Sequence, residues 1–213
     1  MLSLGVDLAG SPNRPTGMCL LDEMLRAKTW IVYRDEEILE AALRYRPAVV
    51  AVDAPLTLPR GRRSLDDREG PHLRECDRAL KDLGIRFLPV TLGPMRALTA
   101  RGIRLRLLLE RAGFTVIEVY PGGAQDLLGI PRKTRGLDSL RRGLESLGIK
   151  GLSAEASADE LDAATAAYVG ILHLRGESTV LAGSDGAIVM PPIGRYAGPR
   201  CRASSGVELV RTE

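Results

Sequence analysis

The sequence predicts an α/β fold, and three observations lead to this prediction. Residues 2–8 alternate apolar side chains with small ones, which is the period of a strand. Further apolar runs at residues 18–22 and 25–33 follow a turn-rich loop, so three antiparallel strands are expected. A helical pattern at residues 36–45 then leads to the almost wholly apolar run 48–55. Such a run is typical of a strand that is buried on both faces and parallel to the first.

The composition is that of an ordinary globular protein. Of the 213 residues, 45% are hydrophobic and 27% are charged, and a chain of this length can bury a substantial core. We expect one domain over residues 1–213. A loop and helical insertion is expected at about 56–112, and a peripheral hairpin and tail at about 179–213.

The remaining patterns complete the expected element order. A strand is expected at 114–121, and helices are expected at 71–80, 93–111, 136–147 and 157–172. Asp35 is the expected cap of the first helix and Ser157 of the last.

Cysteine and histidine usage excludes several kinds of site. The three cysteines, Cys19, Cys76 and Cys201, are odd in number and widely spaced, so they indicate neither a disulfide framework nor a zinc site. His72 and His173 are the only histidines and lie far apart in the sequence. Metal chemistry in this chain must therefore use carboxylates.

Hydropathy and charge suggest where the protein acts. We expect a cytoplasmic protein without a membrane partner, because no basic segment precedes an apolar run and no long apolar stretch follows. The net charge is +3 and most basic residues are arginines, which favour bidentate contacts with phosphate. Arginine also replaces lysine in GC-rich genomes, and the near absence of asparagine and glutamine would suit a thermophilic source equally well.

Two acids lie in the strands that are expected to be parallel neighbours. Asp7, midway along the first, shares the face of small residues that includes Gly5, and Asp53 ends the fourth. A buried carboxylate is costly unless it is paired or binds a metal, and two neighbouring carboxylates raise each other's pKa unless a cation lies between them. Backbone amides or an arginine could instead satisfy Asp7, and Asp53 could simply begin a turn.

Three further acids are candidates. Asp159 and Asp162 lie at i and i+3 on one helix, on a stripe of small residues that would let this helix approach the sheet closely. Acids in a first helical turn also simply favour the helix dipole. Glu118 lies near the end of the fifth strand, where an outward-facing position is the alternative.

Basic residues recur in the insertion and after the fifth strand. The candidate phosphate ligands are Arg74, Arg78 and Lys133. A merely solvated face is the alternative, above all for the arginines of the helix at 93–111. Aromatic residues make up only 4%, which argues against a base-stacking platform as the main binding mode.

Several short motifs resemble those of a known family. They are GVDLAG around Asp7, VDAPL around Asp53, RECDR at 74–78, EVYP from Glu118 and DELDA at 159–163. Their order is similar to that of the domain of unknown function 429 family, a group of predicted RNase H-like nucleases. The resemblance spans most of the chain, and DELDA is also similar to the last motif of RuvC-type Holliday junction resolvases.

This resemblance implies an RNase H-like fold, a mixed five-stranded sheet in the order 3-2-1-4-5 flanked by helices. It implies Asp7, Asp53 and Asp162 as the first metal ligands, with Asp159 and Glu118 as supporting catalytic acids. Such sites use two Mg²⁺ or Mn²⁺ ions about 3.5 to 4 Å apart. Asp7 would bridge the two ions, Asp53 would hold one, and Asp162 or Asp159 would hold the other.

The expected function is metal-dependent hydrolysis of phosphodiester bonds in a nucleic acid whose type the sequence does not specify. Two other classes stay open. A nucleotide-binding phosphotransferase of the actin-like or sugar kinase type shares this fold, and residues 7–11 before the Thr16-Gly17 turn faintly resemble its first phosphate loop. A non-catalytic nucleic-acid-binding module could keep the acids for structure or for a single ion.

Overall fold

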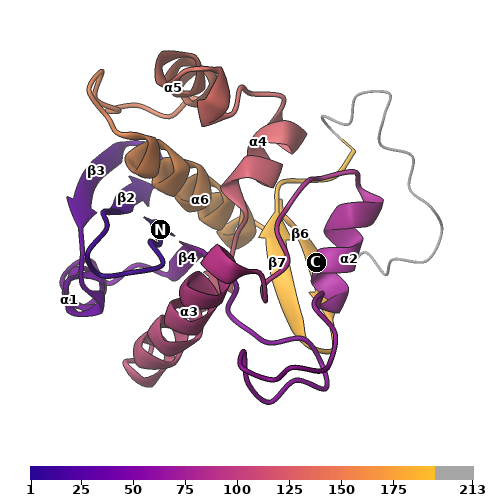
Figure 1. Cartoon of the computed structure of the whole chain (residues 1–213). Helices are drawn as coiled ribbons and strands as arrows, with labels where there is room; N and C mark the ends of the chain where they lie inside the picture. The colour runs from indigo at the N-terminus through magenta and orange to yellow at the C-terminus, as the bar shows by residue number, and fades with distance from the viewer. Residues whose placement is uncertain (195–213) are drawn as a thin grey trace.

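The computed structural model describes residues 1–194, so the predicted tail from position 195 onward lies outside the described residues. Its centre is a five-stranded sheet in the order β3-β2-β1-β4-β5 (Figure 1). β1 is antiparallel to β2 and parallel to β4, and β5 continues the parallel part. This order confirms the predicted RNase H-like fold class. The strands are β1 (Leu2–Asp7), β2 (Thr16–Asp22), β3 (Ala27–Val32), β4 (Val49–Asp53) and β5 (Val116–Glu118).

Helices and a hairpin surround the sheet. The helices are α1 (Asp35–Tyr45), α2 (Glu75–Asp82), α3 (Gly93–Arg111), α4 (Pro121–Leu128), α5 (Leu137–Ser146) and α6 (Ala158–Leu174), with a 3₁₀ turn η1 (Lys133–Arg135). The hairpin consists of β6 (Thr179–Gly183) and β7 (Gly186–Met190). The predicted helix at 93–111 is confirmed at both ends, whereas α2 begins four residues later than the predicted helix at 71–80.

Helix α4 was not predicted from the sequence. Its first turn contains Gly122 and Gly123, and glycine lowers helix propensity, so no local pattern marked it. Packing explains the glycine: a Cβ on Gly123 would lie 2.8 Å from the Tyr120 ring and 2.9 Å from Ile85. Tertiary contact therefore determines this helix more than propensity does.

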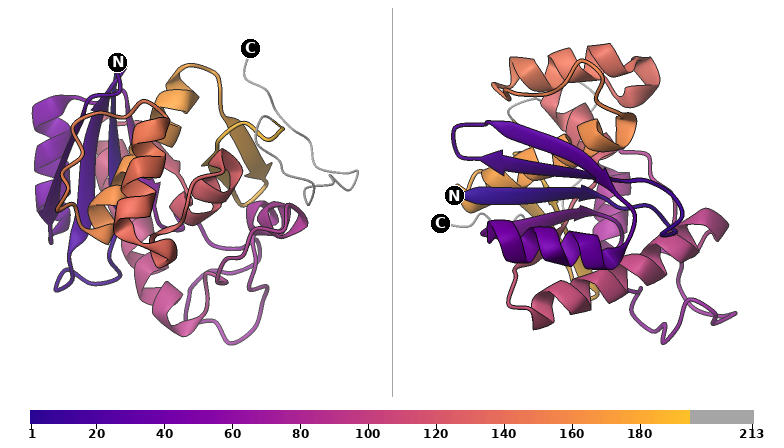
Figure 2. Two further views of the ribbon diagram at one scale, coloured as in Figure 1. Left: turned by 90° about the horizontal axis from the view of Figure 1, so that it is seen from above. Right: turned by 90° about the vertical axis from the view of Figure 1, so that its left-hand side faces the viewer.

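The sheet has a helical layer on each face (Figure 2). Val6 and Val52 point to the face covered by α1 and α3. Cys19 and Ala51 point to the opposite face, which α6 covers. Because side chains alternate along a strand, this division also determines which acids can meet above each face.

Helix α6 lies directly on the backbone of β1 and β2. A Cβ on Gly5 would lie 2.0 Å from the Ala163 carbonyl oxygen, and one on Gly17 would lie 2.0 Å from that of Asp159. These distances are far shorter than a van der Waals contact, so only glycine allows the approach. The predicted close packing of the small-residue stripe is thus confirmed, and it places the first turn of α6 over the ends of both strands.

The hairpin is less peripheral than the sequence indicates. Val119 and Val189 form a bridge between the end of β5 and β7, and Val189 is buried. In the turn, the Asp185 carboxylate accepts hydrogen bonds of 2.9 Å from the backbone N–H groups of Arg60 and Glu75. The hairpin therefore fixes the insertion against the sheet.

Among residues 1–194, no helix is both long enough and apolar enough to cross a membrane.

The substitution Gly17→Ala tests the close approach of α6. We expect it to lower the free energy of unfolding by at least about 1–3 kcal/mol, because the added methyl group must displace helix backbone. Urea unfolding followed by circular dichroism measures the loss. Gly93→Ala is the control, since nothing lies within 4 Å of a Cβ there and a small gain is expected. An equal effect of the two substitutions would contradict the packing argument.

Candidate active site

Asp7 and Asp53 lie side by side at the carboxyl ends of two parallel strands. They are register partners in the β1–β4 ladder, so their side chains share the face that α6 covers. Asp7 is the last residue of β1 rather than midway along it as predicted. This is the edge of an open α/β sheet at which ligands bind, and both side chains remain partly exposed there.

The first turn of α6 brings a third and a fourth acid to this edge. Ser157 caps the helix as predicted: its Oγ accepts from the Glu160 N–H at 3.2 Å, and the Glu160 carboxylate accepts from the Ser157 N–H at 2.9 Å. The cap sets where the helix begins, so Asp162 becomes buried above the sheet while Asp159 stays half-exposed.

The acids at this edge perturb one another. Burial raises the pKa of Asp7 to about 7, with Asp162 adding to the rise, while Lys133 lowers it in part. Burial and then Asp7 raise the pKa of Asp53 well above its usual range. A side-chain hydrogen bond between the two carboxyl groups favours ionised Asp7, as expected if Asp53 keeps the proton and donates it. The two residues therefore form one coupled pair.

Lys133 reaches into this group from the 3₁₀ turn η1. Its Nζ lies 2.7 Å from Asp162 Oδ2, and its side chain is 45% exposed. Burial lowers the pKa of Lys133, but Asp162, Asp7 and Asp159 outweigh this and raise it. Lys133 is thus the internal counter-ion of the acids. Burial raises the pKa of Asp159 as well, while Lys133 and Arg14 lower it in part.

Glu118 points to the other face of the sheet. It is the register partner of Val52, and it pairs with Arg74 through contacts of 2.6 Å to each terminal nitrogen. Its Oε2 also accepts from the Leu56 N–H at 2.8 Å. Glu118 therefore does not join Asp7 and Asp53, but it holds the chain that follows Asp53.

Arg74 is buried and uses all of its donors within the protein. Its five side-chain hydrogen bonds go to Glu118, Asp77 and Thr57. The structure therefore leaves no donor of Arg74 for a phosphate, contrary to the prediction. Arg78, the neighbouring candidate, is exposed on α2.

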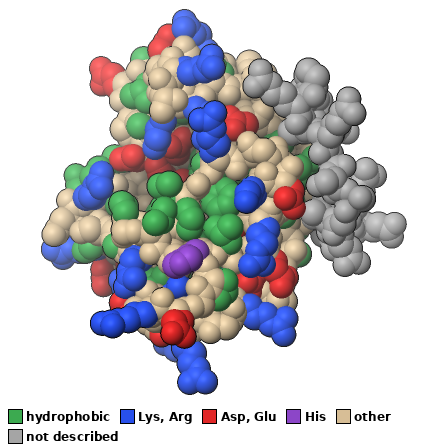
Figure 3. Space-filling model, turned by 45° about the vertical axis from the view of Figure 1, so that its right-hand side comes forward, with side chains coloured by type: hydrophobic (Ala, Val, Ile, Leu, Met, Phe, Trp, Pro, Cys, Tyr) green, Lys and Arg blue, Asp and Glu red, His purple; other side chains and the backbone are tan. Residues whose placement is uncertain are grey.

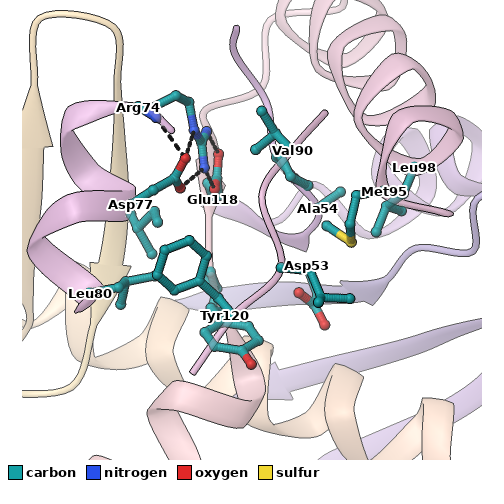
Figure 4. A pocket seen from close by; sticks show the side chains of 15 residues that line it. Asp53, Ala54, Arg74, Asp77, Leu80, Val90, Met95, Leu98, Glu118 and Tyr120 are labelled. Carbon is teal, nitrogen blue, oxygen red and sulfur yellow. Dashed lines mark hydrogen bonds and ion pairs between the residues drawn. The ribbon is translucent and has the colours of Figure 1, made fainter. Parts of the chain in front are cut away.

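A pocket of about 210 Å³ opens beside Asp53 (Figure 4). Its walls come from the ends of β4 and β5, from α2, from the segment 87–90 and from the start of α3. The paired Arg74, Asp77 and Glu118 lie on one side, and Asp53 and Tyr120 lie across from them. The insertion thus covers the edge of the sheet that carries the acids.

The carboxylates suit a hard divalent cation in chemistry, since such cations prefer oxygen ligands. Within the described part of the chain, however, no three acid, histidine or cysteine side chains are arranged to enclose an ion as they stand. Lys133 holds one oxygen of Asp162 instead. A cation that binds Asp162 through this oxygen must therefore displace Lys133.

Two residues of the site had no recognisable pattern in the sequence. The Gln125 amide donates to Asp162 Oδ1 at 2.7 Å and to Thr165, and its being the chain's single glutamine was the one available signal. Arg101 is buried rather than part of a solvated face: it donates to Asp35 at 2.7 Å and to the Ala9 carbonyl at 2.8 Å. Asp35, the expected cap, is instead the first residue of α1, and Arg34 is the N-cap.

The strand order and the acids at its edge define a chain of the RNase H-like class. A family model described as "Protein of unknown function (DUF429)" matches residues 5–186, and the chain belongs to this family. A search of curated proteins finds no match.

Two solved structures are similar, both of RuvC from Thermus thermophilus. The first, RuvC in complex with a Holliday junction substrate, has 15% identity and a TM-score of 0.48, and the match covers 88% of this chain and 99% of that chain. The second, described as a Thermus thermophilus RuvC structure, has 15% identity and a TM-score of 0.47, with 83% and 97% covered. Such identity transfers no residue's role, and the fold class follows from the strand order.

Replacing Arg74 by methionine tests the buried ion network. We expect Arg74→Met to cost about 3–5 kcal/mol of unfolding free energy, because two buried carboxylates lose their counter-ion. Arg141→Met is a matched control: Arg141 also pairs with two carboxylates, Asp138 and Glu145, but on the surface. We expect its urea midpoint to stay close to that of the wild type. Similar losses in both variants would refute a special role for burial.

Asp7→Asn tests the strain among the acids. Asp7 titrates near pH 7 in the folded protein but near pH 4 when unfolded, so the folded state binds the proton more tightly. The stability contributed by this proton is complete below about pH 4 and is lost as the pH rises through about 7. Because asparagine does not titrate, we expect the variant to gain stability relative to wild type over this window. Thermal unfolding in EDTA measures the stability of both proteins across this pH range. A difference in stability that does not change with pH would contradict the raised pKa of Asp7.

Proposed function

We propose that this protein is a divalent-metal-dependent hydrolase of phosphodiester bonds in nucleic acid. The observation that carries the proposal is the group of Asp7, Asp53 and Asp162 at one sheet edge, with two carboxyl pKa values raised by burial and mutual repulsion. Active sites are where such perturbed acids gather. Sites of this chemistry need closely placed carboxylates that bind Mg²⁺ or Mn²⁺.

In this proposal the acids share the cation ligation. Asp7 and Asp53 hold the first ion, and Asp162 with Asp159 completes a second position once Lys133 has moved. Bound Mg²⁺ or Mn²⁺ would activate water and stabilise the leaving oxygen. Gln125 orients the Asp162 carboxylate through its 2.7 Å hydrogen bond.

Two basic side chains are placed to receive the phosphate. Lys133 already lies at this edge, with its Nζ 2.7 Å from Asp162. Arg14 is exposed in the loop between β1 and β2, and its charge lowers the pKa of Asp159 in part. Lys133 is on a short turn and is 45% exposed, which allows its ammonium group to move between carboxylate and phosphate. Glu118 acts at a distance, because its bond to the Leu56 N–H positions the chain after Asp53.

Mn²⁺ binding measured by calorimetry is the first test. We expect saturable binding to the wild type and at least a tenfold loss in Asp7→Asn, because the variant loses a charged ligand of the first ion. Lys133→Met should bind Mn²⁺ several-fold more tightly, because the cation no longer competes with the ammonium group. Asp138→Asn, which removes a 58%-exposed surface carboxylate, is the control and should match wild type.

Activity is tested separately on single-stranded, duplex and branched DNA and RNA with Mn²⁺ or Mg²⁺. We expect cleavage by the wild type that Asp7→Asn abolishes while its circular dichroism spectrum stays unchanged. Cleavage retained in Asp7→Asn would refute the catalytic assignment. Mn²⁺ binding in neither protein, together with nucleic-acid binding, would favour the non-catalytic module.

A further inference from the structure

The pocket beside Asp53 has walls suited to a flat apolar group. Leu80, Val90, Met95 and Leu98 contribute aliphatic surface from three separate segments. The rings of Phe87 and Tyr120 also line it, and the Tyr120 hydroxyl is directed away to donate to the Arg86 carbonyl at 2.7 Å. Tyr120 thereby presents its ring rather than a free donor to the pocket.

The charged residues of the pocket are neutralised, apart from Asp53. Asp77 and Glu118 line the wall, but both carboxylates are bonded to the buried Arg74 (Figure 4). A phosphate group would find no donor of Arg74 free in this pocket. An uncharged ring with one polar edge fits the chemistry better, because the aromatic and aliphatic walls favour a π-face and Asp53 adds a polar group to the lining.

Asp53 belongs both to the pocket and to the coupled pair with Asp7. A phosphodiester held at this pair would place its neighbouring nucleoside at the pocket mouth. The face drawn in Figure 3 shows exposed apolar side chains with both basic and acidic side chains around them. The low aromatic content excludes a long stacking platform, but two rings in one pocket suffice for a single base.

We propose that this pocket receives one unpaired nucleobase of the strand whose phosphate lies at Asp7 and Asp53. The proposal rests on the function proposed above and specifies its substrate class. A base stacked within a duplex cannot enter a side pocket without being extruded. The preferred substrate is therefore single-stranded, or locally unpaired next to the phosphate that is cleaved.

Binding of abasic oligonucleotides tests this directly. Short fluorescent single-stranded DNA and RNA oligonucleotides of one sequence are compared with DNA versions in which a single base is removed at successive positions. Anisotropy is measured with Ca²⁺ present to neutralise the acids. For the wild type, we expect removal of one particular base to weaken binding at least about fivefold, the effect of losing one stacked base.

The variants distinguish the pocket from general binding. In Phe87→Ala and Leu88→Ala, the intact oligonucleotide should bind about as weakly as the abasic one. Leu92→Ala is the matched control: Leu88 and Leu92 are both exposed leucines of the same segment, but only Leu88 lines the pocket. Leu92→Ala should keep the full preference for the intact strand. Leu88, being 57% exposed, can be truncated with little risk to folding.

The remaining outcomes separate this proposal from the one on which it rests. If wild type binds intact and abasic strands equally, the base pocket is refuted and the proposed nuclease function stands. Equal weakening of both strands by Phe87→Ala and Leu88→Ala would also refute the pocket. If no oligonucleotide binds although Mn²⁺ does, both the base pocket and the nucleic-acid substrate are refuted, while the metal site remains.

Discussion

The contact between α6 and the backbone of β1 and β2 is the constraint on which the candidate site depends. Gly5 and Gly17 have no side chain that would keep a helix at normal distance from the sheet, and the backbone of α6 at Ala163 and Asp159 lies directly against them. Because the helix lies so close, Asp162 is buried beside acids that arrive from the sheet. The same closeness helps to raise the pKa values of Asp7 and Asp53, since it reduces the hydration of the carboxylates and brings their charges together.

Much of this arrangement follows from local patterns. Alternating and continuous apolar runs predict the five strands, and the stripe of small residues predicts which face of α6 meets the sheet. The acids at 7 and 53 could be grouped because their strands were expected to be parallel neighbours, and those at 159 and 162 because helical spacing puts them on one face. The full strand order came from the family resemblance and not from local patterns. Helix α4 was not predicted because its glycines lower helix propensity. The reason for Gly123 is its close contact with Tyr120 and Ile85, which only the folded chain brings together.

Pairings between side chains were the part that the sequence could not specify. Arg74 and Lys133 looked alike as candidate phosphate ligands, yet Arg74 is 1% exposed within a carboxylate network and Lys133 is 45% exposed at the acids. Arg101 looked like one more arginine of a solvated helix and is instead buried against Asp35. Partners of these arginines lie up to 92 positions away, and no periodicity encodes such a distance.

The hairpin turn has a consequence for how the protein is made. Asp185 ties together Arg60 and Glu75, residues that leave the ribosome more than a hundred positions earlier. Likewise, α6 reaches the acids of β1 and β4 only after most of the chain has been synthesised. The sheet's first three strands can pair early because their contacts are local, whereas the insertion must wait for the hairpin. On a nascent chain, the acidic site therefore lacks Asp159 and Asp162 until α6 has been synthesised, and the pocket lacks Ile188 until the hairpin follows.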